Sequence, residues 1–246
     1  MPLALNFAFA TVLVPTIAGA LAVGNTKEAS SKASYSFLIS IILILPCAIG
    51  YIALAKQIYK VIYFNAPYGY DLLAWTAVSL LFSALSQTMS GILQGIGKVY
   101  VPAIGLLVGC AIKLILNLVL IRIPAVNIYG AVISSIVCQF VAFLISFLVM
   151  VKYISLKITL MKYIVKPLCA GVLMGAAAIG VYHLAGLALG SGFKGNLIAT
   201  VLAIGIAACV YFVLVMVFKI LNREEIETLP GGNKLYGLLC KVGLYK

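Results

Sequence analysis

The sequence predicts an all-α integral membrane protein with about seven transmembrane helices, and three observations lead to this class. Hydrophobic residues make up 65% of the 246 residues, charged residues make up only 9%, and the mean hydropathy is +1.22. Apolar runs of about 20 residues recur along the chain, and each is long enough to cross a bilayer as a helix. Lipid leaves backbone N–H and C=O groups no partners outside a helix or a closed barrel, whose strands would be short and alternating.

The first two expected spans both contain a proline. They run over residues 3–23, with Pro15, and residues 35–55, with Pro46. Each proline removes one helix hydrogen bond, so we expect both helices to be kinked. Such a kink serves either plain packing or a hinge or cavity wall, and the sequence leaves both interpretations open.

The next three expected spans cover residues 72–93, 101–121 and 130–151. Before the first of them, the segment KQIYKVIYFNAPYGYD (residues 56–71) gathers several tyrosines, and Trp75 follows. Tyrosine and tryptophan concentrate where a membrane meets water, so this segment predicts an aromatic belt at the outer interface.

The last two expected spans cover residues 168–187 and 197–218, and a polar tail follows them. Asn222 is a good N-cap with Glu225 three residues on, which predicts a short helix that ends at Pro230. In the final KLYGLLCKVGLYK (residues 234–246), apolar residues share one side, which predicts a helix lying on the membrane surface.

The basic residues predict which way the chain is inserted. Twelve of the 17 lie in the first, third and fifth loops and the tail, and four lie in the other loops. Lysine and arginine accumulate on the cytoplasmic side, so we expect a cytoplasmic C-terminus in a bacterial plasma membrane. The net charge of +12 therefore reflects topology and anionic lipid, and we expect no nucleic acid partner. Seven spans then leave the N-terminus outside, which is also expected where an odd number of preceding helices is missing.

One face of the fourth span carries the most informative pattern. Gly105, Gly109, Lys113 and Asn117 recur every four residues, so they share one side of the helix. The glycines allow a neighbouring helix to approach, which turns the lysine and the asparagine toward protein. Serines and Gln87 form a similar polar stripe on the third span.

Lys113 lies within an apolar run, where a lysine costs about 2.5 to 3.5 kcal/mol on insertion scales. The chain has five acidic residues, and all of them lie in loops, at a span edge or in the tail. Two interpretations stay open. The ammonium group either reaches the interface or backbone carbonyls, or it faces an anion in a cavity.

Catalytic patterns are absent from the sequence. There are no paired carboxylates, no cluster of histidine and cysteine ligands, and no glycine-rich phosphate loop. We therefore expect no enzyme, no cofactor and no metal site.

Several segments together resemble a known family. They include VPTIAGALAVGNTKEAS (14–30), ILQGIGK (92–98), GCAIKLILN (109–117), IYGAVISSIVCQF (128–140) and NREEIETLPGG (222–232). These segments are similar to the C-terminal half of polysaccharide-biosynthesis membrane proteins of the stage V sporulation protein B-like type. That type belongs to the exporter superfamily of lipid II flippases, O-antigen flippases and multidrug exporters.

The resemblance implies a division of the chain and a pattern of missing parts. Residues 1–152 would be helices of the second lobe of a 14-helix exporter, residues 153–221 a loop and an extra helix pair, and residues 222–246 a cytoplasmic tail. The first lobe would be absent, so activity would need that lobe or a second chain as partner.

The implied function is flipping of an undecaprenyl-linked polysaccharide or peptidoglycan precursor across the cytoplasmic membrane by alternating access. Lys113 would supply charge to the diphosphate, and Asn117, Gln87 and Asn6 would be further substrate contacts. Multidrug export is an alternative of the same class. A scaffold that transports nothing, or an inert truncated product, is an alternative of another class.

Overall fold

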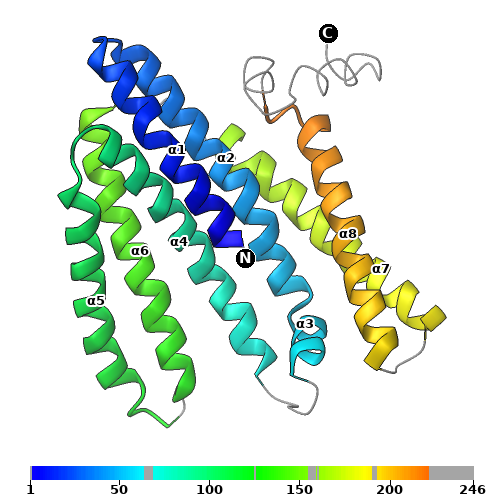
Figure 1. The fold of residues 1–246 in the computed structure, drawn as a ribbon. Coiled ribbons are helices and arrows are strands. Elements are labelled where there is room, and N and C mark those ends of the chain that lie inside the picture. Colours follow the sequence, from blue (N-terminus) through cyan, green and yellow to red (C-terminus); the bar gives the residue numbers. More distant parts are fainter. Residues whose placement is uncertain are drawn as a thin grey trace.

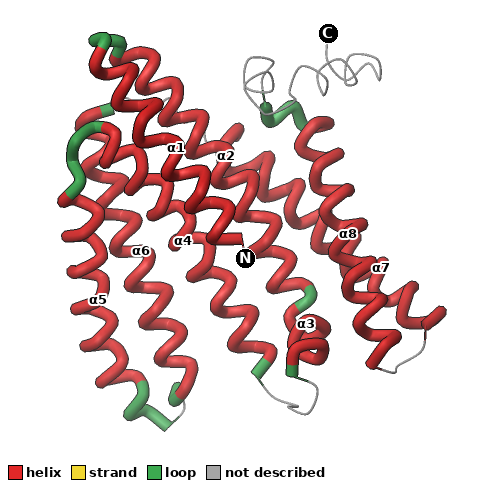
Figure 2. The backbone as a smooth tube through the Cα atoms, in the orientation of Figure 1, coloured by secondary structure: helices red, strands yellow, loops and turns green. Residues whose placement is uncertain are grey.

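In the computed structural model of the chain, the described residues form helices joined by short loops, and none of them forms a strand (Figures 1 and 2). The described residues are 2–63, 69–124, 126–154, 159, 161–189 and 193–221. The expected all-α class is confirmed. The two helices predicted for the tail lie outside the described residues.

In the described part of the chain, eight α-helices and one turn of π-helix follow one another. They are α1 (Pro2–Ala22), α2 (Thr26–Ala53), α3 (Ala55–Ile62), α4 (Tyr70–Gly95), α5 (Tyr100–Leu120), α6 (Ile128–Tyr153), the π-helix η1 (Met161–Val165), α7 (Lys166–Leu189) and α8 (Phe193–Val217). Six of the described segments are long and apolar enough to cross a membrane, and α1 supplies a shorter apolar helix. Each of the seven predicted spans therefore corresponds to one apolar helix.

The second helix is longer than hydropathy predicted, because it begins at Thr26 and not near residue 35. The side chain of Asn25 caps the new start by accepting a hydrogen bond from Glu28 N at 3.1 Å. Lys32 then forms an ion pair with Glu28 at 2.7 Å, one turn apart. A hydropathy window does not register these polar contacts, so the sequence placed the boundary too late.

The aromatic segment after α2 is partly helical. Leu54 interrupts the helix, and α3 then continues for eight residues. Leu54 and Ala55 are 1% and 4% exposed, so the junction is anchored in the protein. In the described part of this segment, the rings of Tyr59 and Tyr63 lie 4.9 Å apart.

The helices form two groups joined through α2 (Figure 1). In the first group, α4 packs against α1, α2 and α6, and α5 packs against α6. In the second group, α7 packs against α8 and against α2. Lys166 fastens this pair at one end, because its Nζ donates to the carbonyl of Phe218 at 2.8 Å, just past the end of α8.

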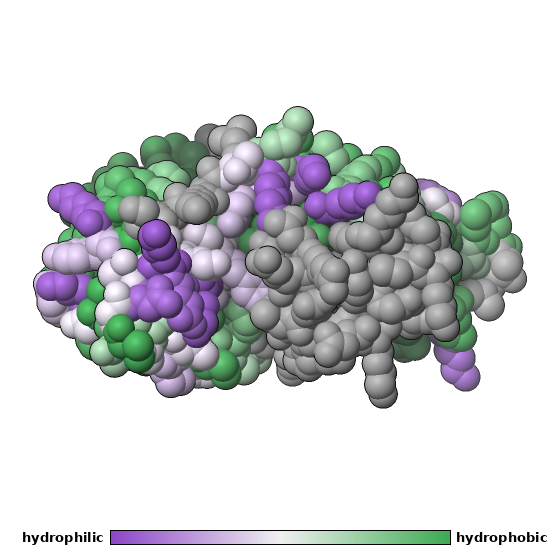
Figure 3. Space-filling model, turned by 90° about the horizontal axis from the view of Figure 1, so that it is seen from above, coloured by the Kyte–Doolittle hydropathy of each residue, from purple (hydrophilic) through white to green (hydrophobic). Residues whose placement is uncertain are grey.

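Alternating helix directions divide the charged loops between two ends of the bundle. The turn between α1 and α2, the turn between α4 and α5, and the end of α8 lie at one end, here called the basic end (Figure 1). Among the described lysines it carries Lys27, Lys32, Lys98, Lys152, Lys162, Lys166 and Lys219. Figure 3 looks onto this end and shows hydrophilic side chains gathered there, while much of the margin is hydrophobic. The loops from α2 to α4 and from α5 to α6 lie at the opposite end.

Candidate functional site

A buried polar cluster joins α1, α2 and α4, and we call its four members the Asn6 cluster: Asn6, Ser40, Gln87 and Thr88. Asn6 is 1% exposed, and its Nδ2 donates to Ala84 O at 2.8 Å and to Gln87 Oε1 at 3.3 Å. A longer contact of 3.4 Å joins Nδ2 to Thr88 Oγ1. The hydroxyls of Ser40 and Thr88 share a hydrogen bond of 2.5 Å. Three helices are thereby linked through side chains in the apolar interior.

A glycine on α4 permits this contact with α1. A Cβ added at Gly91 would lie 2.5 Å from the carbonyl oxygen of Ala10, which is closer than real side chains allow. Close approach of backbones at glycine is the usual way in which membrane helices pack tightly. The short distance between α1 and α4 is what lets the Asn6 amide reach acceptors on α4.

One atom of the Asn6 cluster is left over. Asn6 Oδ1 is buried and has no hydrogen-bond partner among the described residues. Gln87 is half-buried and is the most accessible member of the cluster. The cluster therefore contains one buried acceptor without a partner, Asn6 Oδ1, and one partly accessible amide side chain, that of Gln87.

A second polar group lies between α5 and α6, and we call it the Lys113 face: Gly105, Gly109, Lys113, Asn117 and Ser134. Ser134 donates a hydrogen bond to Asn117 Oδ1 at 2.5 Å across the two helices. A Cβ at Gly109 would lie 2.6 Å from Cys138 O, and one at Gly105 would lie 3.2 Å from Ala142 O. The face predicted from the sequence therefore packs against α6, as the glycine spacing indicated.

Lys113 differs from its neighbours on this face. Its side chain is half-buried, and in the described part of the chain it makes no ion pair and no hydrogen bond. An ammonium group at this depth normally faces a partner or a wet cavity. The described residues therefore leave its charge available to an anion.

The four residues that the sequence singled out do not form a single cluster. Asn6 and Gln87 are in hydrogen-bond contact, whereas Lys113 and Asn117 belong to the contact of α5 with α6. The sequence analysis did not assign Ser40 and Thr88 to the site. Thr88 directly follows Gln87 of the predicted polar stripe, and this adjacency was the sequence signal that could have found it.

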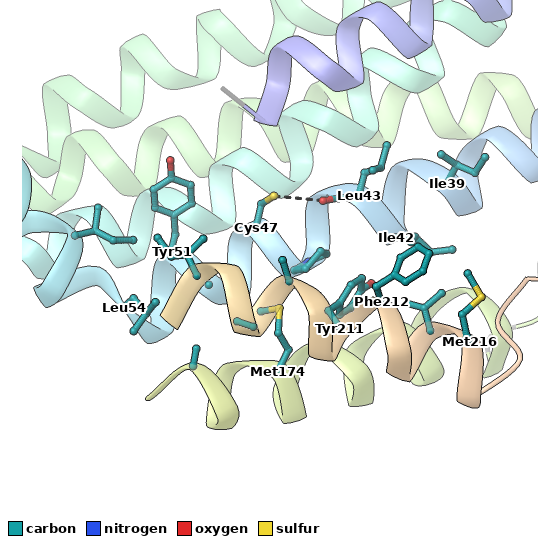
Figure 4. Close-up of a pocket in the computed structure, with 18 of the residues that line it drawn as sticks. Ile39, Ile42, Leu43, Cys47, Tyr51, Leu54, Met174, Tyr211, Phe212 and Met216 are labelled. Atoms are coloured by element: carbon teal, nitrogen blue, oxygen red, sulfur yellow. Dashed lines mark hydrogen bonds between the residues drawn. The ribbon is translucent and has the colours of Figure 1, made fainter. Parts of the chain in front are cut away.

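An apolar groove of about 540 Å³ lies between α2, α7 and α8 (Figure 4). Side chains of α2 line one side and side chains of α7 and α8 line the other, among them Ile39, Cys47, Tyr51, Met174, Tyr211 and Phe212. None of the described side chains that line the groove is charged. The groove suits a hydrocarbon chain, because ligand pockets of this size bind mostly through apolar contact.

Comparison with known proteins agrees with this architecture of a multi-pass membrane protein. Residues 3–119 match the MatE family. The chain is 29% identical over 244 residues to "Lipid II flippase MurJ" of Bacillus subtilis (strain 168), across 94% of this chain and 43% of that protein. It is 27% identical over 227 residues to "Uncharacterized membrane protein YabM" of the same organism, across 92% of this chain and 42% of that protein.

These matches confirm the resemblance found in the sequence: the chain is similar to proteins of the exporter and flippase type. It spans less than half the length of the curated relatives that it matches.

Proposed function

We propose that the chain is part of a transporter that flips an undecaprenyl-linked polysaccharide or peptidoglycan precursor across the cytoplasmic membrane. The observation that carries this proposal is Lys113, a half-buried cation in an apolar helix without a partner among the described residues. A diphosphate group that crosses a membrane needs a cation and hydrogen-bond donors in a wet cavity. Alternating access then carries that cavity from one side of the membrane to the other.

The two polar groups take different parts in this proposal. Lys113 supplies the charge, and Asn117 next to it supplies amide hydrogens, because its Oδ1 is already engaged by Ser134. Gln87 is half-buried and contacts the substrate as a donor. Asn6 is fully buried here, so its contact with substrate requires α1 and α4 to move apart during transport.

The apolar groove completes the substrate site in this proposal. An undecaprenyl chain has to stay in hydrocarbon while its headgroup passes through a polar cavity. A groove with an uncharged lining that is open between α2 and the pair α7 and α8 meets that need. The relative named a lipid II flippase supports a lipid-linked substrate over a drug.

The proposal also includes partners and orientation. Residues 1–152 act as the second lobe of an exporter, residues 153–221 as its extra helix pair, and residues 222–246 as a cytoplasmic tail. The first lobe, or a second chain, completes the cavity. The basic end faces the cytoplasm, because lysine and arginine accumulate on that side.

The test is Lys113→Met in the intact protein as the cell makes it, in a strain that depends on this transporter. We expect loss of complementation at an unchanged amount of membrane-inserted protein, because methionine keeps the length of the side chain and removes the charge. Lys152→Met, at the basic end, is the matched control and should complement. Normal growth with Lys113→Met would contradict the proposal, and rescue of sensitivity to cationic dyes instead would favour drug export.

A further inference from the structure

A second hollow lies at the end of the bundle opposite the basic end, and it shares no lining residue with the groove. It has a volume of about 430 Å³ and lies between the first turns of α4 and α6. Six described side chains line it: Asp71, Trp75, Val126, Tyr129, Val132 and Ile133. Neither the Asn6 cluster nor the Lys113 face contributes to it.

Helix periodicity places the lining residues of each helix on one side of that helix. Asp71 and Trp75 are one turn apart on α4, and Tyr129, Val132 and Ile133 share one side of α6. Trp75 is 53% exposed, and Tyr129 and Ile133 are each 38% exposed. The hollow therefore presents two aromatic rings, an aliphatic surface and one carboxylate to an incoming ligand.

The packing of the neighbouring residues explains why α4 and α6 leave this space. About two turns further along both helices, the rings of Phe82 and Phe140 meet edge to face at 5.1 Å. At the start of α6, Gly130 packs on α5, where an added Cβ would lie 2.7 Å from Leu120 Cβ. The first turn of α6 is thus held against α5, while the phenylalanines hold the helices together higher up.

The chemistry of the lining selects among ligand classes. A pyranose ring has a flat face of C–H groups and a rim of hydroxyl donors. Aromatic and aliphatic side chains bind the face through apolar contact, and a carboxylate accepts from the hydroxyls through strong charge-assisted hydrogen bonds. A phosphate or other anion is disfavoured, since Asp71 is the sole charged residue in the described lining.

An ammonium ligand fits this hollow less well than a sugar. Aromatic cages for such cations surround the charge with rings, and here two rings leave the rest of the lining aliphatic. Asp71 is exposed, so its attraction for a cation is weakened by water. Water competes with hydroxyl hydrogen bonds at this carboxylate as well, so contact between a sugar face and the two rings supplies the difference between the two ligand classes.

We propose that the hollow formed by Asp71, Trp75 and Tyr129 binds a sugar ring. This inference rests on the proposed function, because the lipid-linked precursor carries its sugar on the headgroup. In the proposed orientation the hollow opens on the outer side, where the headgroup arrives after crossing. It is a docking site for the sugar, separate from the charge that serves the diphosphate.

Trp75 is the only tryptophan of the chain, so its fluorescence reports directly on the hollow. The experiment titrates the full chain in lipid nanodiscs with N-acetylglucosamine, and in parallel with choline and with inorganic phosphate. We expect a saturable change with the sugar at a Kd of about 10 mM or tighter and no saturable change with the other two. Absence of a saturable sugar response would mean that these residues are an aromatic belt only, and a response to choline alone would identify a cation site; either result overturns the proposal.

Two variants test the lining residues of the hollow, and a third variant is the matched control. Asp71→Asn should weaken sugar binding about tenfold, because the sugar hydroxyls would then donate to a neutral amide oxygen and not to a charged carboxylate. Tyr129→Leu should also weaken sugar binding. Tyr153→Leu is the control and should leave sugar binding unchanged, because Tyr153 lies at the other end of α6 and is as exposed as Trp75. Equal binding by Asp71→Asn and the parent would overturn the assignment of Asp71.

The titration is independent of transport, so it separates the two proposals. Lys113→Met should bind the sugar as tightly as the parent chain does. If the sugar titration were saturable and Lys113→Met complemented, the sugar site would stand and the proposed transport role of Lys113 would be rejected. If complementation depended on Lys113 and the titration showed no saturable sugar response, the transport proposal would stand and the sugar site would be rejected.

Discussion

The Asn6 cluster and the Lys113 face both place polar side chains inside apolar helices, and they differ in how far those side chains are satisfied. Asn6 is buried and its Nδ2 donates to acceptors on α4, so the donor side of its amide is satisfied inside the protein while Oδ1 has no partner among the described residues. Lys113 is half-buried and has no partner among the described residues. A neutral amide within a helix contact stabilises that contact, whereas an unpaired charge costs stability and persists where it has a function. We therefore interpret the first as a joint between helices and the second as a binding group.

The largest expected effect on stability comes from blocking the approach that builds the joint. Gly91→Leu should lower the free energy of unfolding by about 3 kcal/mol, because its Cβ would collide with the Ala10 carbonyl. Unfolding in a denaturing detergent, followed by Trp75 fluorescence, measures it. Gly180→Leu on α7 is the control, since a Cβ there meets nothing within 4 Å. Equal losses for the two variants would show that the contact of α1 with α4 is not the sensitive one.

Removing the central amide of the joint should have a smaller effect. Asn6→Leu should lower the free energy of unfolding by about 1 kcal/mol, because lost hydrogen bonds are partly offset by removal of the unpartnered Oδ1. The same detergent titration applies. Thr16→Val is the control, since this hydroxyl bonds only to carbonyls of its own helix. If Thr16→Val lowered the free energy of unfolding as much as Asn6→Leu does, the hydrogen bonds between α1 and α4 would have no special weight.

The smallest stability effect is expected on the Lys113 face. Ser134→Ala should cost about 0.6 kcal/mol, the typical value for a hydrogen bond between membrane helices. Ser135→Ala is a close control, because both serines donate to Ala131 O and Ser134 also donates to Asn117. If Ser134→Ala destabilised the protein more than Asn6→Leu, the Lys113 face would be the main joint, and our comparison would be reversed.

Local properties of the chain explain which parts of the fold could be predicted. Hydropathy located seven apolar helices, because each run must satisfy its backbone within a helix wherever its neighbours lie. It placed the start of α2 too late and missed α3, because polar contacts such as Asn25 with Glu28 extend a helix beyond its apolar part. The amphipathic α3 has a mixed sequence that a long window averages out.

Candidate residues were predicted less completely than helices. Spacing by four indicated that Gly105, Gly109, Lys113 and Asn117 share a face, and the contacts with α6 agree. The same reasoning gave no reason to pair Asn6 with Gln87, which lie 81 positions apart. Ser40 was missed because it lies inside an apolar run, although Ser36 precedes it by one helical turn.

The sequence by itself determined the membrane class, the helical spans, the uneven distribution of lysines and the polar side of α5. Those features depend on composition and on periods of a few residues along one chain segment. Only the tertiary structure decided that the polar residues divide into two groups, that an apolar groove lies beside α2, and that Asp71, Trp75 and Tyr129 line one hollow. Helix neighbours depend on close packing, where one glycine against one backbone carbonyl determines which surfaces can touch.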